Sequence, residues 1–177
     1  MKARLTPAMI GLLAVLIALV AVFTLVPRVP VPATGGYANL SSVAITFTSL
    51  VFGPFVGAVA GGIGTAIADL LGGFLPFAPL SLIAHGLEGL LIGLLGRGQR
   101  SVWRMIAAWL AGSLAMMAVY FVGESLLLTG PAAALAEVPF NAFQAALGAL
   151  VGIPLVLAVR RAYPAVDRLG RRQTWTE

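Results

Sequence analysis

The sequence predicts an all-α polytopic membrane protein with six transmembrane helices and with its N- and C-termini in the cytoplasm. Of the 177 residues, 60% are hydrophobic and 10% are charged, whereas a soluble domain has about 25% charged residues. Apolar runs of nearly 20 residues recur along the chain, which is the length of a membrane-spanning helix. Basic residues gather in alternate connections, as the positive-inside rule requires.

The connections between the apolar runs are short, so we expect a single membrane domain that comprises residues 1–177. The chain has no cysteine and therefore no disulfide or thiolate-metal chemistry. Its net charge of +5 would suggest a nucleic-acid partner in a soluble protein. Here the charge follows the expected topology, so the predicted surroundings are the lipid bilayer and no nucleic acid.

The first predicted helix, 6–26, follows Lys2 and Arg4 and has the general layout of a signal peptide. Its apolar stretch is longer than the 7 to 15 residues, approximately, of a signal-peptide core. We therefore expect a retained transmembrane helix. It has no polar residue between Ala8 and Phe23, so one face is free to contact lipid or another protein.

Proline and glycine mark the later helix boundaries. The stretch 27–36, Gly53-Pro54, the segment 75–79, the loop 96–100 and the segment 129–139 with its two prolines are read as breaks. They place the six helices at approximately 6–26, 38–52, 55–74, 79–96, 103–128 and 138–160, and they leave a basic C-terminal tail at 161–177.

The weakest break is Gly53-Pro54, because a proline can also kink one long helix. Charge favours six helices over five. With five, the basic cluster at 97–104 and the C-terminal tail would fall on opposite faces. With six, only Arg28 lies outside, and the cytoplasmic side receives Lys2, Arg4, Arg97, Arg100, Arg104, Arg160, Arg161, Arg168, Arg171 and Arg172.

Polar side chains within the predicted spans gather in the outer half, while the inner half has almost none. Three pairs share a helix face at a spacing of three or four residues, and Tyr37 and Asn39 lie at the outer mouth of the second helix. A one-sided cluster predicts a pocket that opens to the exterior and is sealed below by apolar packing. The three pairs are His85 with Glu88, Tyr120 with Glu124, and Asn141 with Gln144.

Several of these residues also have ordinary structural interpretations, which remain open. His85 can serve as an interhelical hydrogen-bonding residue, as can Asn141 and Gln144. Tyr120 can be a packing aromatic residue. Two further acids are not among the predicted site residues: Asp69, near a helix end, can contact headgroup water, and Glu137 is expected to be solvated in the loop before Pro139.

Small residues form two patterns at helical spacing. Gly57, Gly61, Gly64 and Ala68 follow one face of the third helix, and Ala14 and Ala18 lie on the first. Small residues at this spacing let helix backbones approach closely. Packing inside the bundle is the usual interpretation of such a pattern.

Motifs of common enzymes are missing from the sequence. It has no Walker A sequence, no HExxH motif and no GxSxG elbow. We therefore expect no ATP hydrolysis by this chain, no metal site, no cofactor and no enzymatic activity.

Ordered motifs resemble the substrate-binding (S) component of energy-coupling factor (ECF) vitamin transporters, and look most like the branch of hydroxymethylpyrimidine and related vitamin-precursor carriers. The resemblance covers about residues 8–160. The segments that carry it are Gly36-Tyr37-Ala38-Asn39-Leu40, Leu50-Val51-Phe52-Gly53-Pro54-Phe55-Val56-Gly57-Ala58, Gly61-Gly62-Ile63-Gly64, Ala68-Asp69-Leu70-Leu71-Gly72-Gly73, His85-Gly86-Leu87-Glu88-Gly89-Leu90 and Pro139-Phe140-Asn141-Ala142-Phe143-Gln144.

The resemblance implies six helices and an outward-facing pocket in a bacterial or archaeal cytoplasmic membrane. It also implies partners, a transmembrane T component and two cytoplasmic ATPase subunits, with Ala14 and Ala18 matching the docking motif on the first helix. Relatives often have Asn-Leu-Gly-Asp where this chain has Asn39-Leu40-Ser41-Ser42. The substrate of a relative is therefore not carried over.

The predicted function is capture of a vitamin or vitamin precursor for import. A pyrimidine, a pyridoxine-like molecule, a deazapurine and riboflavin all suit the pocket. One alternative is an independent proton-coupled carrier that uses Glu88 or Glu124, and another is a membrane enzyme whose outer acids act as general acid and base. The predicted substrate-binding residues are Tyr37, Asn39, Phe77, His85, Glu88, Tyr120, Glu124, Asn141 and Gln144.

Overall fold

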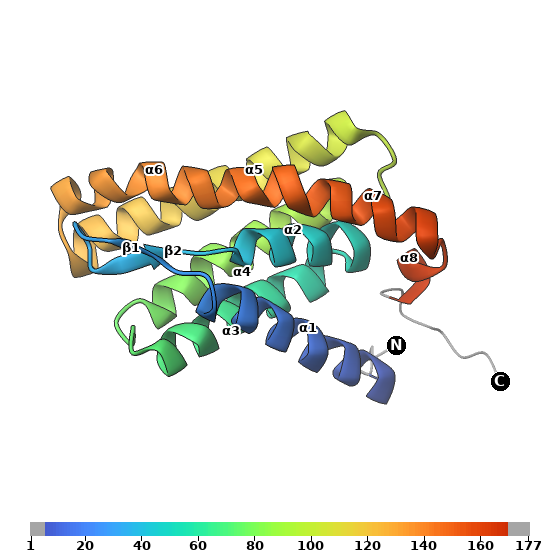
Figure 1. Ribbon diagram of the computed structural model, residues 1–177, viewed down its shortest axis with the longest axis horizontal. Coiled ribbons are helices and arrows are strands. Elements are labelled where there is room, and N and C mark those ends of the chain that lie inside the picture. The colour runs from blue at the N-terminus through green and yellow to red at the C-terminus, as the bar shows by residue number, and fades with distance from the viewer. Residues whose placement is uncertain (1–5, 170–177) are drawn as a thin grey trace, which may run out of the picture.

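The computed structural model describes residues 6–169 and is built almost entirely of helices (Figure 1). Two short strands and two π-helical turns, η1 and η2, interrupt the helical order. The elements are α1 (Pro7–Leu25), β1 (Val29–Val31), β2 (Gly36–Ala38), α2 (Ser41–Phe52), α3 (Pro54–Gly72), α4 (Ala78–Gly96), α5 (Val102–Gly123), η1 (Glu124–Leu128), α6 (Pro131–Leu147), η2 (Gly148–Gly152), α7 (Ile153–Ala162) and α8 (Val166–Leu169).

Five helical stretches in the described chain are long and apolar enough to cross a membrane. They are α1, α3, α4, α5 with η1, and the continuous run of α6, η2 and α7. The predicted class, an all-α polytopic membrane protein, is confirmed. Continuity through η1 and η2 makes the last two stretches 27 and 32 residues long, longer than the approximately 20 residues that a span requires.

The second predicted helix differs from the other five because α2 has only 12 residues. At 1.5 Å per residue it is about 18 Å long, well short of a hydrocarbon core of about 30 Å. Every α2 residue except Phe47 is buried, and the helix contacts α1, α3, α4 and η2. Because protein surrounds it, the extended backbone that leads into it is shielded from lipid.

The break at Gly53-Pro54 is a true helix boundary. Gly53 has a φ of +95°, a conformation that glycine adopts readily and other residues avoid. Pro54 then occupies the start of α3, where its missing N–H is not needed. The chain therefore forms two helices here rather than one kinked helix.

The predicted loop at 129–139 is wrong, because α6 begins at Pro131 and passes through Pro139. Gly130, with a φ of +85°, ends the preceding turn, and Pro131 starts the helix in the position that proline tolerates best. The alanine-rich residues that follow are strong helix formers. As a result Glu137 is a helical residue with 4% of its surface exposed, not a solvated loop residue.

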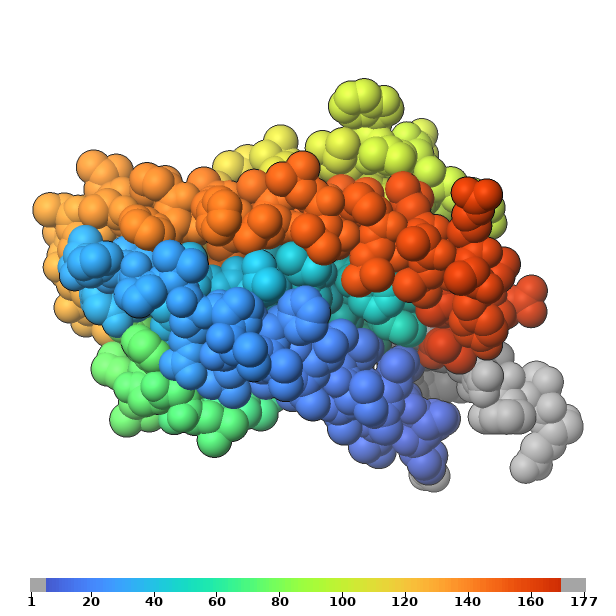
Figure 2. All heavy atoms as spheres, viewed as in Figure 1, coloured from blue at the N-terminus to red at the C-terminus, as the bar shows by residue number. Residues whose placement is uncertain are grey.

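The proline- and glycine-rich stretch after α1 forms an ordered antiparallel hairpin of β1 and β2. Val29 pairs with Ala38 and Val31 with Gly36, and Gly35 takes a positive φ in the turn. Figure 2 shows the hairpin at one end of the molecule, between α6 and the α3–α4 connection. This end is called the hairpin end below.

The glycine pattern on α3 packs helices inside the bundle. A Cβ on Gly61 would lie 2.7 Å from the backbone oxygen of His85, and one on Gly64 would lie 2.7 Å from the Cβ of Val20. Both distances are too short for a methyl group, so these glycines let α4 and α1 approach α3. On α1, Ala14 and Ala18 lie on the exposed face.

The basic residues that follow α4 lie at the end opposite the hairpin, together with the start of α1 (Figure 1). Arg160 holds this end together, because its guanidinium donates to the backbone oxygens of Gln99 and Leu50 and to Asp167, each at 2.9 Å. Charge is therefore asymmetric along the bundle. The predicted basic residues Lys2, Arg4, Arg171 and Arg172 lie outside the described residues, and the cytoplasmic location of the termini stays a prediction.

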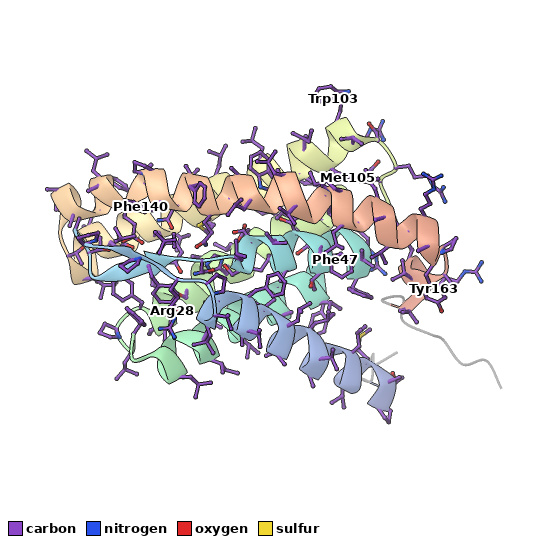
Figure 3. The ribbon with its side chains drawn as sticks, in the orientation of Figure 1. Arg28, Phe47, Trp103, Met105, Phe140 and Tyr163 are labelled. Carbon is purple, nitrogen blue, oxygen red and sulfur yellow. The ribbon has the colours of Figure 1, made fainter. Side chains whose placement is uncertain are left out.

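An apolar core occupies the part of the bundle nearer this basic end. It includes Leu16 of α1, Ile45 and Leu50 of α2, Met105 of α5 and Val156 of α7, all buried. Figure 3 labels Met105 within this half, and Trp103 projects outward beyond it.

Candidate substrate-binding site

A small polar cavity lies at the hairpin end of the bundle. Its volume is about 20 Å³, which is room for about one water molecule. The hairpin segment, the α3–α4 connection and helices α1, α3, α4, α5 and α6 all contribute to its walls. The lining residues are Thr24, Gly36, Tyr37, Asn39, Thr65, Asp69, Phe77, Ser81, His85, Tyr120, Glu137, Asn141 and Gln144.

Tyr37 of β2 joins the hairpin to α3. Its hydroxyl donates to Oδ1 of Asp69 at 2.7 Å, and its ring lies 4.5 Å from the ring of Phe74 between centroids. The Arg28 guanidinium lies 5.3 Å from the centre of the Tyr37 ring, within the range of a cation–π contact. Burial, and then the neighbouring Asp69, raise the pKa of the Tyr37 phenol, so this group remains a hydrogen-bond donor.

The turn of the hairpin is tied to α6. The Thr34 hydroxyl donates to Oε2 of Glu137, and the backbone N–H of Gly36 donates to the same hydroxyl at 3.1 Å. A Cβ on Gly36 would lie 3.4 Å from the Glu137 carboxyl and 3.5 Å from Phe77. Both are ordinary contact distances, and a tighter one, 3.2 Å, is to Oγ1 of Thr34 within the hairpin itself.

A directed chain of hydrogen bonds runs from the exit of the hairpin to α4. The Asn39 backbone N–H donates to Oε1 of Gln144 at 2.8 Å. The Gln144 amide nitrogen lies 3.5 Å from Nε2 of His85, and Nδ1 of His85 lies 2.6 Å from Oε2 of Glu88. A backbone N–H is always a donor, so the Gln144 oxygen faces it and the Gln144 nitrogen faces the imidazole.

This direction determines the histidine tautomer. The Gln144 NH₂ group can only donate, so Nε2 of His85 accepts and Nδ1 carries the hydrogen that Glu88 receives. We call these four residues, Asn39, Gln144, His85 and Glu88, the polar relay. Tyr120 packs beside it, with its ring 5.6 Å from the imidazole and its hydroxyl 2.6 Å from that of Ser81.

Seven of the nine predicted residues line the cavity, and two do not. Glu88 is fully buried behind His85. Glu124 is also fully buried, at the start of η1, and neither carboxyl oxygen has a hydrogen-bond partner within the described chain. The seven that line it are Tyr37, Asn39, Phe77, His85, Tyr120, Asn141 and Gln144.

Other lining residues were not predicted from the sequence. Asp69, for which contact with headgroup water was one of the open interpretations, is 3% exposed and accepts a hydrogen bond from Tyr37. Helical spacing could have found two others. Ser81 precedes His85 by four residues and Thr65 precedes Asp69 by four, so each pair shares a helix face.

The expectation of a nearly apolar inner half needs correction. The side-chain hydroxyls of five residues along α2 are buried, and none has a hydrogen-bond partner among the described residues. Because α2 runs from the hairpin end toward Arg160, these hydroxyl groups are polar groups that lie between the cavity and the basic end. Serine and threonine change hydropathy little, which is why the sequence interpretation overlooked them. The five are Ser41, Ser42, Thr46, Thr48 and Ser49.

The cavity offers carboxylates, amides, hydroxyls, an imidazole and three aromatic rings. Such groups bind small molecules by hydrogen bonding and stacking. Among residues 6–169, no cluster of three or more His, Asp or Glu side chains is arranged to hold a metal ion.

Two comparisons with known proteins show what this chain is similar to. A family model described as the S component of the ECF-type riboflavin transporter matches residues 4–161, a range that contains every cavity-lining residue. An uncharacterized protein from the gap 3′ region of Pyrococcus woesei is 35% identical over 133 residues, which are 75% of this chain and 88% of that relative. The chain therefore belongs to the family of ECF-type riboflavin transporter S components.

Proposed function

We propose that the cavity at the hairpin end captures a small heteroaromatic vitamin or vitamin precursor from the exterior. As an ECF S component, the chain is a substrate-binding transporter subunit that works with T and ATPase components. In this proposal it docks on one transmembrane T component and two cytoplasmic ATPase subunits, which drive inward delivery.

The observation that carries the proposal is the convergence of polar side chains in one buried place. Five helices and the hairpin segment contribute to a cavity whose lining residues include Asp69, His85, Asn141 and Gln144. Polar groups within membrane spans are costly unless they pair or serve a function. Their convergence favours a binding site over scattered interhelical contacts.

The charge asymmetry supports an outward-facing cavity. The basic cluster around Arg160 lies at the end opposite the hairpin (Figure 1), and basic connections face the cytoplasm. In this proposed orientation the hairpin lies at the exterior surface, where it covers the cavity.

Ligand entry requires this cover to open. A vitamin-sized ligand needs a site of several hundred Å³, whereas the cavity has about 20 Å³. We propose that the hairpin moves outward by breaking the contacts of Thr34 with Glu137 and of Tyr37 with Asp69. Both contacts reform when it closes over the ligand.

The ligand is proposed from the chemistry of the walls. Tyr37, Phe77 and Tyr120 provide rings for stacking on a heteroaromatic molecule, and the amides and carboxylates bind its polar edge. Riboflavin, from the description of the matching family, and a hydroxymethylpyrimidine-type precursor, from the sequence resemblance, both fit this class. On α1, the exposed Ala14 and Ala18 are the proposed docking position for the T component.

Native mass spectrometry of the detergent-purified protein tests the capture proposal by identifying a co-purified small molecule. Binding of that molecule is then measured by calorimetry for the wild type, for Asn141→Ala and for Trp103→Ala. Trp103 is the matched control, because it is 79% exposed at the basic end (Figure 3). We expect Asn141→Ala to weaken binding about tenfold, the effect of one hydrogen bond, and Trp103→Ala to leave it unchanged.

Wild-type affinity in Asn141→Ala would remove this residue from the site. Uptake assays distinguish the proposal from an independent carrier. Proteoliposomes with this chain alone should not accumulate the ligand under a pH gradient, whereas proteoliposomes that also hold the T component and the ATPases should do so with ATP. Accumulation by the chain alone would contradict the proposal.

A further inference from the structure

Two buried carboxyl groups lie together behind the turn of the hairpin. Glu124 begins η1 and Glu137 lies in α6, on either side of the connection at Gly130, and η1 packs against α6. Glu124 is 0% exposed and Glu137 is 4% exposed. Their side chains interact electrostatically, so they form a buried pair of like groups.

The π-helical turn fixes the position of Glu124. Its backbone oxygen accepts the N–H groups of Thr129 at 2.9 Å and of Gly130 at 3.1 Å, which closes the turn. Single π-helical turns are rare and occur frequently at functional sites. The Glu124 side chain therefore starts from a fixed backbone and is directed into the bundle.

The Glu124 carboxyl has no donor to accept from. Both of its oxygens are buried, and no donor among residues 6–169 reaches either of them. The side-chain group with which it can form a hydrogen bond is the carboxyl of Glu137. Two ionised carboxylates can only accept hydrogen bonds, so this bond requires a proton on one of them.

The surrounding groups do not supply a positive charge to the pair. None of the cavity-lining residues in the part of the chain that the structure describes is Lys or Arg. Arg28 and His85 act on Asp69, and His85 also contacts Glu88, whereas the charge that acts on Glu124 is that of Glu137. The titratable groups that line the cavity from the neighbouring elements are Tyr37 of β2, Asp69 of α3, His85 of α4 and Tyr120 of α5.

We propose that Glu124 and Glu137 share one proton when the hairpin is closed, and that this proton locks the turn of the hairpin onto α6. The protonated Glu124 donates to the Glu137 carboxylate, whose Oε2 accepts the Thr34 hydroxyl. The Thr34 oxygen accepts the backbone N–H of Gly36 at 3.1 Å. One directed chain of hydrogen bonds thus joins η1, α6 and the hairpin.

This inference rests on the proposed opening of the hairpin and identifies what regulates it. Loss of the shared proton leaves two like charges buried side by side, a state that water relieves once the hairpin has moved away. Opening therefore releases one proton, and closing takes one up. By linkage, the closed state is favoured at lower pH, and one proton changes the opening equilibrium by at most about tenfold per pH unit.

Thiol labelling measures the opening without any ligand. The sequence has no cysteine, so a single cysteine can be placed in β1. Val31→Cys reports opening, because Val31 is 1% exposed, and Val29→Cys in the same strand is the matched control, because Val29 is 50% exposed. The rate of labelling by a neutral maleimide, Val31→Cys relative to Val29→Cys, should rise at least about threefold from about pH 6 to about pH 9.

The variant Glu124→Gln tests whether the pair causes this dependence. Its amide donates to Glu137 as the protonated acid does, but it cannot lose the proton. In this background the relative labelling rate should stay low and should not change with pH.

Infrared difference spectra detect the proton itself, because the carbonyl band of a carboxylic acid is separate from the bands of a carboxylate. The spectrum of the wild type minus that of Glu124→Gln near pH 7 should contain one carboxylic acid band. Asp167→Asn is the control, because Asp167 contacts Arg160 at 2.9 Å at the basic end, and it should give a carboxylate difference instead.

Several outcomes would overturn the inference. These are a relative labelling rate that does not change with pH, a pH dependence that persists in Glu124→Gln, and the absence of the acid band. A dependence on added Na⁺ or Ca²⁺ in place of pH would also overturn it, because a cation would then hold the pair together.

If Glu124→Gln does not fold, Glu137→Gln provides the same test, because it also leaves a single carboxyl in the pair. All of these measurements are made without ligand, so a negative result leaves the capture proposal intact. Conversely, the absence of any bound small molecule in native mass spectrometry would count against capture and would not alter the labelling result.

Discussion

The polar relay predicts that Glu88, as the acceptor for Nδ1–H, and Gln144, as the donor to Nε2, together hold His85 in one tautomer. Substitution Glu88→Leu removes the acceptor of Nδ1–H in a contact of 2.6 Å whose side chains are 2% and 0% exposed. The opposite tautomer also leaves a donor without an acceptor, because Nε2–H would then face the Gln144 amide donor. One buried donor is left unsatisfied in either case.

The magnitude follows from that donor. An unsatisfied buried donor costs about 1–3 kcal/mol, and every 1.4 kcal/mol is a factor of about ten in an equilibrium constant. We therefore expect ligand affinity to fall by about 5- to 150-fold if His85 must be ordered in the bound state. Glu88→Gln keeps an acceptor oxygen for Nδ1–H and should stay within a few-fold of the wild type.

Nitrogen-15 NMR measures the tautomer of His85 directly, because His85 is the single histidine of the sequence. Protein purified with a tag that contains no histidine should show one protonated nitrogen, Nδ1, and one unprotonated nitrogen, Nε2. The same pattern is expected in Glu88→Gln and a changed or averaged pattern in Glu88→Leu. A hydrogen on Nε2 in the wild type, or an unaltered spectrum in Glu88→Leu, would refute the directional reasoning.

Three further predictions concern packing, protonation and the basic end. Gly61→Ala places a Cβ 2.7 Å from the backbone oxygen of His85, so thermal unfolding should show a bundle that is less stable by about 1–3 kcal/mol. Gly11 has open space around it, so the control variant Gly11→Ala should be neutral. Folding raises the pKa of the Tyr37 phenol, so the stability that this shift contributes is present below about pH 10 and is lost as the pH rises further. The difference in absorbance at 295 nm between the wild type and Tyr37→Phe should therefore show no Tyr37 phenolate at pH 10. Arg160→Ala removes hydrogen bonds to three groups and should lower thermal stability while ligand affinity in the folded fraction stays unchanged; a specific loss of affinity would show that the two ends are coupled.

Local chemistry explains why much of the fold was predictable from the sequence. Gly53-Pro54 ends one helix and begins another because each residue imposes its own backbone geometry. The same local logic failed at Pro139, which was interpreted as the start of a helix and lies inside α6. Propensity is a weak guide where good helix formers lie on both sides of a proline and the helix packs against neighbours.

The candidate site was partly predictable for a related reason. Residues such as His85, Asn141 and Gln144 are polar within apolar segments, and that contrast is visible in one dimension. Asp69 was omitted from the predicted site and Glu137 was expected to be solvated, because each lies near a proline or glycine break. Their burial comes from the hairpin, which brings Tyr37 and Thr34 over them from more than 30 residues away.

The sequence by itself determined the membrane class, the main helix boundaries and most of the polar side chains that line the cavity, because hydropathy, proline and glycine act on the nearest residues. Only the tertiary structure decided which carboxyl groups are free, which way the polar relay donates and that a hairpin covers the cavity. Those properties depend on hydrogen bonds between residues far apart in the chain, and such pairings exist only after the helices have packed.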